Sequence, residues 1–368
     1  MFELSEIQRE LQDLVASVVS DQVSGDTVRT VMLDTGVAVD VWDTLVQAGV
    51  TTLLIDEEYG GAGASFADAM VVAEVLARAV TPVPYLSSSV LAPTFLAGLD
   101  PSPARESVYA GLVAGERATV AYRDPNGDAA KPSGVTAQVT DGVVTLNGTS
   151  GHVLDGVGAT HLLVVARHEN HDVAVWVPRD TNGVTATAVP VLDLTRPLAN
   201  VTFDASAVPV TQMLHGDVTQ ALRRMNRAAR VTLAREAVGG LDALLVMTTA
   251  YARDRLQFGR AIGSFQAVKH RLVDVLIQKE AALSAAAYAS GMCDEDDATE
   301  ADIASLTAAA YCLPAYATAS ATCLQIFGGI GFTWEHDVHL HLKRAKASSL
   351  LFGSATHHRR ELARVLDL

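Results

Sequence analysis

The chain of 368 residues is long enough for two or three domains, and its 49% content of hydrophobic residues suffices for a sizeable core. Its 42 Asp and Glu outnumber 27 Lys and Arg, which gives a formal net charge of -15. This acidic excess argues against nucleic acid or an anionic membrane as the main partner. A polyanionic small molecule is still compatible with it, because such a ligand needs only a local basic patch.

Several sequence features indicate a soluble cytoplasmic protein. Cys293, Cys312 and Cys323 are odd in number and lack C-x-x-C spacing, so we expect reduced thiols and neither a disulfide framework nor a zinc site. The first residues, Met1-Phe-Glu-Leu-Ser-Glu6, have neither the basic nor the apolar region of a signal peptide. Polar residues interrupt every apolar run early, so no membrane-spanning helix is expected.

Residues 1–115 are predicted to form a helical domain. Apolar residues near the start recur at three- and four-residue steps, which is typical of an amphipathic helix. They are Ile7, Leu11, Leu14, Val15 and Val18. A glycine-rich loop over 56–63 follows, and Ser65 is expected to cap a helix from Phe66 to Val80. Prolines end this helix at Thr81-Pro-Val-Pro84.

Residues 116–212 are predicted to form a β-domain, either a sandwich or a barrel. Here β-branched runs alternate with Asn-Gly, Asp-Gly and proline-containing turns, and this is the pattern of strands and hairpins. The runs begin at Val143 and continue over 162–165, 173–177 and 184–191. The chain therefore changes from helices to a sheet near its middle.

Residues 213–368 are predicted to form a second helical domain, a bundle rich in Ala, Leu and Val. Breaks are expected at 259–263, at 292–299 and at Gly328. The acidic run Asp294-Glu-Asp-Asp297 is interpreted as a solvated loop between helices. Helices, then a β-domain, then a helical bundle make the predicted fold class α+β.

Two stretches of the last domain combine glycine turns with polar and aromatic side chains. The first is Tyr251-Ala-Arg-Asp-Arg-Leu-Gln-Phe-Gly-Arg-Ala-Ile-Gly-Ser-Phe-Gln266, and the second is Gln325-Ile-Phe-Gly-Gly-Ile-Gly-Phe332. Glycine lets the backbone come close to a flat or charged group, and the Gln325 amide offers both a donor and an acceptor there. A plain turn between two helices is the alternative interpretation of each stretch.

Taken together, the two stretches resemble the acyl-CoA dehydrogenase family. They match R-x-x-F-G-x-x-(I/L)-x-x-x-Q and then Q-x-x-G-G-x-G in order and spacing, and the loop at 56–63 resembles P-E-x-x-G-G-x-G with Asp56 in place of proline. The resemblance covers essentially the whole chain. It implies that these residues hold the FAD of a neighbouring subunit. The residues concerned are Arg255, Gln257, Phe258, Gln266, Gln325, Gly328 and Gly329.

The β-domain departs from the family at both places where the resemblance implies contact with the flavin ring. The family has (T/S)-E-P where this chain has Arg123-Asp124-Pro125, and it has W-I-(T/S) where this chain has His152-Val153-Leu154. His152 is kept as a candidate that stacks on the ring, with an ordinary strand-end histidine as the alternative. These departures argue against binding of a flavin by the β-domain of this chain.

The catalytic base of the family is also missing. Dehydrogenation of an acyl thioester needs a carboxylate that removes the α-proton. The family carries its glutamate at one of two positions, and these are Phe352 and Ala229 here. Glu236, two helical turns beyond Ala229, is a weak substitute candidate, and pairing with a nearby arginine is the alternative.

Two further groups of polar residues have plainer interpretations. Glu57 and Glu58 are expected to be solvated loop acids and not catalytic carboxylates. His336, His339 and His341 alternate with apolar residues, and histidines on one helix face can bind a metal. The resemblance instead makes them replacements of the residues ahead of the family's R-D-A-K stretch, so no metal site is predicted.

The resemblance implies an oxidoreductase, a flavoprotein of lipid metabolism that carries out FAD-dependent α,β-dehydrogenation of an acyl-CoA as in β-oxidation. The missing base and the kept FAD contacts are similar to one subunit of heteromeric members that act in lipid and steroid side-chain degradation. A hetero-oligomer, a dimer of dimers with a homologous subunit, is therefore expected, with an electron-transfer flavoprotein as acceptor. A self-sufficient homo-oligomer with a displaced base, and a flavin-free scaffold or acyl-CoA-binding protein, are the alternatives.

Overall fold

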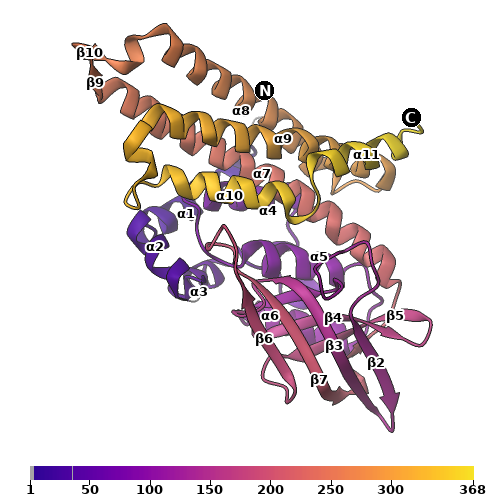
Figure 1. Ribbon diagram of the computed structural model, residues 1–368. Helices are drawn as coiled ribbons and strands as arrows, with labels where there is room; N and C mark the ends of the chain where they lie inside the picture. Colours follow the sequence, from indigo (N-terminus) through magenta and orange to yellow (C-terminus); the bar gives the residue numbers. More distant parts are fainter. Residues whose placement is uncertain (1–3, 35) are drawn as a thin grey trace. The chain divides into compact units, whose positions relative to one another are not determined.

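A computed structural model describes residues 4–34 and 36–368 (Figure 1). The chain forms two compact units, which we call the helical unit and the sheet unit. The helical unit comprises Met1–Thr30, Ser65–Thr81 and Ala229–Leu368. The sheet unit comprises Val31–Ala64 and Pro82–Ala228. The prediction that residues 1–6 are not part of a signal peptide falls partly outside the described residues.

Serine caps begin the two amino-terminal helices of the helical unit. The hydroxyl of Ser5 accepts from the amide of Gln8 at the start of α1 (Glu6–Gln22), and Ser65 accepts from the amide of Asp68 at the start of α4 (Phe66–Arg78). In both caps the third residue of the helix bonds back to the serine amide, which makes a capping box. The predicted Ser65 cap is therefore confirmed.

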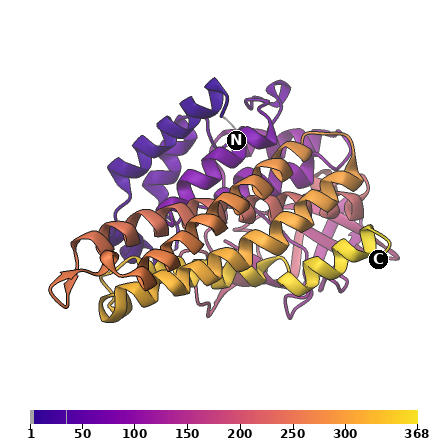
Figure 2. The ribbon, with the colours of Figure 1, turned by 90° about the horizontal axis from the view of Figure 1, so that it is seen from above.

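Long helices form the rest of the helical unit. They are α7 (Val218–Asp254), whose first turns belong to the sheet unit, α8 (Gln266–Met292), α9 (Ala298–Phe327), α10 (Val338–Leu351) and α11 (Ala355–Val365). Helices α8 and α9 run side by side (Figure 2). Adjacent glycines let α7 approach its neighbours closely, because a Cβ at Gly239 would overlap the Glu74 carbonyl of α4 and one at Gly240 would overlap the Tyr316 ring of α9.

The sheet unit contains one sheet with the strand order β6-β7-β3-β2-β4-β5-β8, and β1 pairs in parallel with β4. The strands are β1 (Ala118–Ala121), β2 (Val135–Thr140), β3 (Val143–Leu154), β4 (His161–His168), β5 (His171–Pro178), β6 (Val184–Val189), β7 (Leu198–Pro209) and β8 (Met213–Leu214). Alternate side chains of these strands gather in one apolar core, which includes Leu146, Val164, Val175 and Phe203.

Several further helices precede the strands in the sequence. They are α2 (Gly25–Leu33), α3 (Val39–Gln47), η1 (Glu57–Tyr59), η2 (Tyr85–Leu91), α5 (Ala92–Leu96) and α6 (Pro103–Val113). The predicted succession of helices, sheet and helices is confirmed, whereas the domain boundaries after 115 and 212 stay predictions. No helix within 4–34 and 36–368 is both long and apolar enough to span a membrane.

The acidic residues at 294–297 have structural roles. The Asp294 carboxylate accepts from the amides of Phe66 and Ala67 at 2.6 and 3.2 Å, which ties the loop after α8 to the start of α4. Asp297 caps α9 by accepting from the amide of Thr299 at 3.0 Å. Residues 294–297 are exposed, as predicted for a solvated loop. Their carboxylates also bond to the first amides of α4 and α9.

A buried histidine joins α9 and α10 in the core of the helical unit. Nδ1 of His341 lies 2.8 Å from the hydroxyl of Tyr316, and both side chains are buried. Burial lowers the pKa of His341 to about 4, because the imidazolium would lose its water. The folded protein therefore holds this histidine neutral at neutral pH.

The first prediction is that acid destabilises the chain through His341. Its pKa of about 4 in the folded protein lies below the ordinary value of 6.5, so between these two pH values the unfolded chain binds more protons and stability falls as pH falls. Between pH 7 and pH 5 this site costs about 2 kcal/mol of unfolding free energy. Urea unfolding of His341→Gln should show a pH dependence weakened by that amount. The exposed His171→Gln is the control, and an unchanged pH dependence in His341→Gln would contradict the prediction.

Candidate cofactor-binding site

A hairpin projects from one end of the helical unit, between α7 and α8 (Figure 1). Its strands are β9 (Leu256–Gln257) and β10 (Arg260–Ala261), with Gln257 opposite Arg260. The two residues of the turn, Phe258 and Gly259, have φ of 53° and 76°. Left-handed backbone at both positions suits a two-residue hairpin, yet it is unfavourable for phenylalanine.

The hairpin presents apolar and polar side chains to the outside. Phe258 is 92% exposed and Leu256 is 64% exposed, and the only ring beside Phe258 among the described residues is that of Phe265, at 6.2 Å in edge contact. Arg255 and Gln257 are exposed as well, as is Gln266 at the start of α8. A large exposed aromatic on a constrained turn indicates a contact that lies outside this chain.

The glycine turn after α9 is the second part of the site. It is the short helix η5 (Gly328–Phe332), and Gly328 has a φ of 64°, which requires glycine. Gly329 has no such φ, and a Cβ there would meet no atom of the chain within 4 Å. The chain itself therefore makes no demand for glycine at 329.

The structure brings the two sequence stretches to the same end of the helical unit. The hydroxyl of Tyr251, one turn before Arg255, donates to the carbonyl of Phe327 at 3.4 Å. The rings of Tyr251 and Phe327 lie 4.6 Å apart. Arg255 thus follows one side of this contact and Gly328 follows the other, and we call this region the hairpin end.

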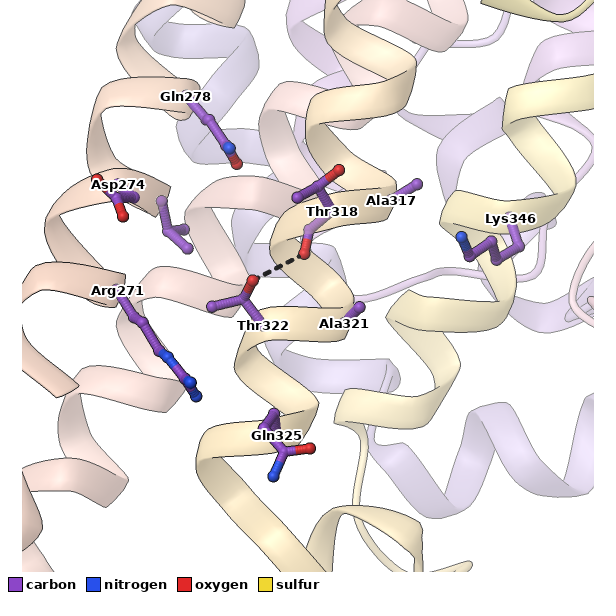
Figure 3. Close-up of a pocket in the computed structure, with 10 residues that line it drawn as sticks. Arg271, Asp274, Gln278, Ala317, Thr318, Ala321, Thr322, Gln325 and Lys346 are labelled. Carbon is purple, nitrogen blue, oxygen red and sulfur yellow. Dashed lines mark hydrogen bonds between the residues drawn. The ribbon is translucent and has the colours of Figure 1, made fainter. Parts of the chain in front are cut away.

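A polar groove between α8 and α9 continues from Gln325 (Figure 3). Its volume is about 600 Å³, and Lys346 of α10 closes one side. The lining residues are Arg271, Asp274, Val275, Gln278, Ala317, Thr318, Ala321, Thr322, Gln325 and Lys346. Apart from Gln325, none was predicted from the sequence, because three helices supply these residues and no local motif marks them.

In the sheet unit, the residues that replace the family's flavin contacts fold onto one another. The Asp124 carbonyl accepts from the amides of Gly127 and Gly151 at 2.9 and 3.0 Å, and a Cβ at Gly151 would meet this carbonyl at 2.8 Å. The Arg123 guanidinium lies over the Tyr122 ring, 5.4 Å from its centre, and Arg123 is buried. The loop after Arg123 is therefore packed directly against β3.

His152 lies in the irregular part of β3, with a φ of 51°. Its ring rests against Gly127, where a Cβ would overlap the imidazole. The loop that begins at Asp124 thus covers a ring that was predicted to stack on a cofactor. One face of the imidazole therefore lies against this loop, and stacking of His152 on a flavin stays a prediction.

The residues at the family's two base positions have different surroundings. Ala229 is fully buried in α7, and Phe352 forms the C-cap of α10. Glu236 is nine-tenths buried two turns further along α7. Near Ala229, Arg230 pairs with Asp302 at 3.3 Å. Neither family position supplies a carboxylate to take up a proton.

Comparison with known proteins agrees with the motifs. Residues 5–99 match the family described as acyl-CoA dehydrogenase, N-terminal domain, and residues 218–366 match acyl-CoA dehydrogenase, C-terminal domain. The fold and these matches define an FAD-dependent oxidoreductase of mixed helix and sheet. The chain belongs to the acyl-CoA dehydrogenase family.

Individual relatives extend over nearly the whole chain. Acyl-CoA dehydrogenase IpdE2 of Mycobacterium tuberculosis is 32% identical over 363 residues, which cover 97% of this chain and 95% of the relative. The ChsE4-ChsE5 complex from Mycobacterium tuberculosis is similar in structure, with a TM-score of 0.90, 28% identity, and coverage of 100% of this chain and 99% of that chain. The Tcur3481-Tcur3483 steroid ACAD has a TM-score of 0.86, 28% identity, and coverage of 98% and 97%.

The two halves of an FAD site differ in how well they fit the cofactor. At the hairpin end, Arg255 offers a permanent cation with forked donors for a pyrophosphate, Phe258 offers an exposed ring, and the backbone at Gly328 and Gly329 is open. These residues fit FAD. In the sheet unit the loop from Arg123 to Gly127 is packed onto β3, and the loss of the flavin contacts there stays a prediction.

The second prediction tests the hairpin end. Arg255→Ala should weaken FAD retention by tenfold or more in the assembled enzyme, because loss of a charged hydrogen-bond donor costs about 1.5–3 kcal/mol. Flavin absorbance after extensive dialysis measures the retention. Arg253→Ala, which removes an exposed arginine in the last turn of α7, two residues before Arg255, is the matched control. Equal flavin content in both variants would count against the assignment.

Proposed function

We propose that this chain is one subunit of a heteromeric acyl-CoA dehydrogenase and that it completes the FAD site of a homologous partner subunit. The observation that carries the proposal is the hairpin end, where Phe258 is 92% exposed on a left-handed turn. Among the described residues, only the Phe265 ring lies beside it, in edge contact. A cofactor held mainly by another subunit accounts for it.

The exposed surface of α8 supports association with another chain. Val273, Leu276 and Ile277 form a stripe at three- and four-residue spacing, and Ile277 is 59% exposed. Phe332 of η5 is 71% exposed. Contiguous exposed apolar side chains of this kind are typical of interfaces and are unfavourable in water. A homologous dehydrogenase subunit is the proposed partner, within a dimer of dimers.

In this proposal each residue of the hairpin end has a defined role. Arg255 neutralises the pyrophosphate, and Phe258 packs on a flat part of the cofactor. Gln325 and the backbone at Gly328 and Gly329 supply hydrogen bonds close to it. Bound FAD supplies the chemistry of hydride acceptance from the β-carbon of the acyl group.

The proton of the α-carbon needs a base that this chain lacks at the family's positions. Ala229 and Phe352 have no titratable group, and Glu236 lies about 10 Å along the helix from Ala229. The partner subunit is therefore proposed to contribute the carboxylate, at the FAD site that both chains build. The chain described here positions the cofactor and excludes water from it.

The relatives support a substrate class and a setting for this activity. One of the similar structures is called the ChsE4-ChsE5 complex, and the other, Tcur3481-Tcur3483, is called a steroid ACAD. We propose that the substrate is a coenzyme A thioester whose acyl group is the side chain of a steroid. We propose an electron-transfer flavoprotein as the electron acceptor. A cytoplasmic location is proposed as well, because all three cysteines are free thiols.

The third prediction is that the chain is catalytically incomplete alone. The purified lone chain should hold little flavin and show negligible acyl-CoA oxidation with a dye acceptor, because general base catalysis supplies on the order of 10²–10⁴ in rate. Both properties should recover on co-expression with a homologous partner. Turnover by the lone, homogeneous chain at a rate comparable to the mixture would contradict the proposal and direct attention to Glu236.

The fourth prediction concerns the lost base. Phe352→Glu restores a carboxylate at a position where relatives carry one, at the C-cap of α10. If this chain lacks a flavin in its sheet unit, the variant should gain no dehydrogenation in the absence of the partner. Phe352→Gln is the matched control for shape. A gain of turnover in Phe352→Glu alone would show that the chain holds its own flavin and lacks only the base.

A further inference from the structure

A second cavity lies within the helical unit, where α1, α4, α7 and α8 meet, and no part of the proposed function uses it. Its volume is about 460 Å³, which is within the range of small-molecule sites. Its lining residues are Leu4, Gln8, Gln12, Ala67, Val71, Glu74, Arg235, Leu283, Ala287, Tyr288, Ser290, Gly291, Met292 and Glu295. It shares none of them with the groove beside Gln325.

Small residues on the facing helices leave this space open. Ala287 and Gly291 stand on α8, and Ala67 stands on the first turn of α4. The Asp294 carboxylate holds the first turn of α4, since it accepts from the amide of Ala67 and from that of the preceding Phe66. The cavity is thus bounded by elements that are fixed to one another.

A buried ion pair lies among the lining residues. Nη2 of Arg235 is 2.6 Å from a carboxylate oxygen of Glu74, and these side chains are 6% and 10% exposed. Nε of Arg235 is shielded from solvent and has no acceptor among the described residues. A buried donor of a charged group without an acceptor is unfavourable, and native proteins satisfy nearly all such groups. An acceptor from a bound molecule would satisfy this one.

The charges around the cavity define the kind of molecule that fits. Glu74 pairs with Arg235 and, outside the lining, also with Arg78 at 3.3 Å, while Glu295 is a second carboxylate among the lining residues, so an anionic ligand is disfavoured. Val71 and Leu283 supply apolar walls. We propose that this cavity binds an uncharged molecule with an apolar body and one oxygen acceptor, such as a ketone, which receives a hydrogen bond from Nε of Arg235. This inference does not rest on the proposed function.

The bicyclic ketone 1-decalone tests the proposal, with decahydro-2-naphthoic acid as its charged counterpart. Saturation-transfer NMR on the full chain should detect the ketone and give a response at least about tenfold weaker for the acid. Ala287→Phe fills the cavity and should abolish the ketone signal. Ala281→Phe, the same change at an exposed position of α8, should retain it. Thermal melting of both variants checks that they are folded.

Two further variants keep the test decisive. Gly291→Phe adds a ring where a Cβ meets no atom within 4 Å, so it should block the cavity without strain if Ala287→Phe fails to fold. Arg235→Lys keeps the charge opposite Glu74 but removes the Nε donor. It should weaken binding of the ketone by roughly tenfold. Undiminished ketone binding in a folded cavity-filling variant, or equal binding of the acid, would overturn the proposal.

Discussion

The constraint on which the account depends is the turn that connects α7 to α8. Its two residues take left-handed backbone, and one of them is Phe258, which points a nearly fully exposed ring away from the chain. Backbone strain and exposure of an aromatic ring both cost free energy, and among the described residues only the edge contact with the Phe265 ring is present to offset them. The contact between Tyr251 and Phe327 then fixes this turn beside the glycines after α9. A cofactor held by a neighbouring subunit would explain both the exposed ring of Phe258 and the position of this turn beside the glycines.

The same chain has no carboxylate at the two positions that the family resemblance implies for the base, which are Ala229 and Phe352. Its sheet unit has closed the loop from Arg123 onto β3, where Gly151 and Gly127 permit a close approach that any side chain would prevent. The two positions for the base carry methyl and phenyl groups. A shared FAD site needs the hairpin-end contacts from one chain and the sheet-unit contacts from the other. Two homologous chains can therefore divide these contacts between them.

Much of this was predictable from the sequence because local chemistry decided it. Ser65 caps α4 as its position before an apolar run predicts, and the glycine turn at Gly328 ends α9 as expected. The orientation of His152 was not predictable, because a bulge in β3 and a loop that begins at Asp124 decide it together. The buried pair of Glu74 and Arg235 is likewise invisible in sequence, since its partners stand on helices that meet only in the folded chain.

The central claim is that this chain completes a flavin site held by another subunit and holds none in its own sheet unit. The most direct measurement is the ratio of FAD to protein in the complex co-purified with its homologous partner, from flavin absorbance and amino-acid analysis. The account predicts one FAD for each pair of chains. A ratio of one FAD per chain in the complex would contradict it.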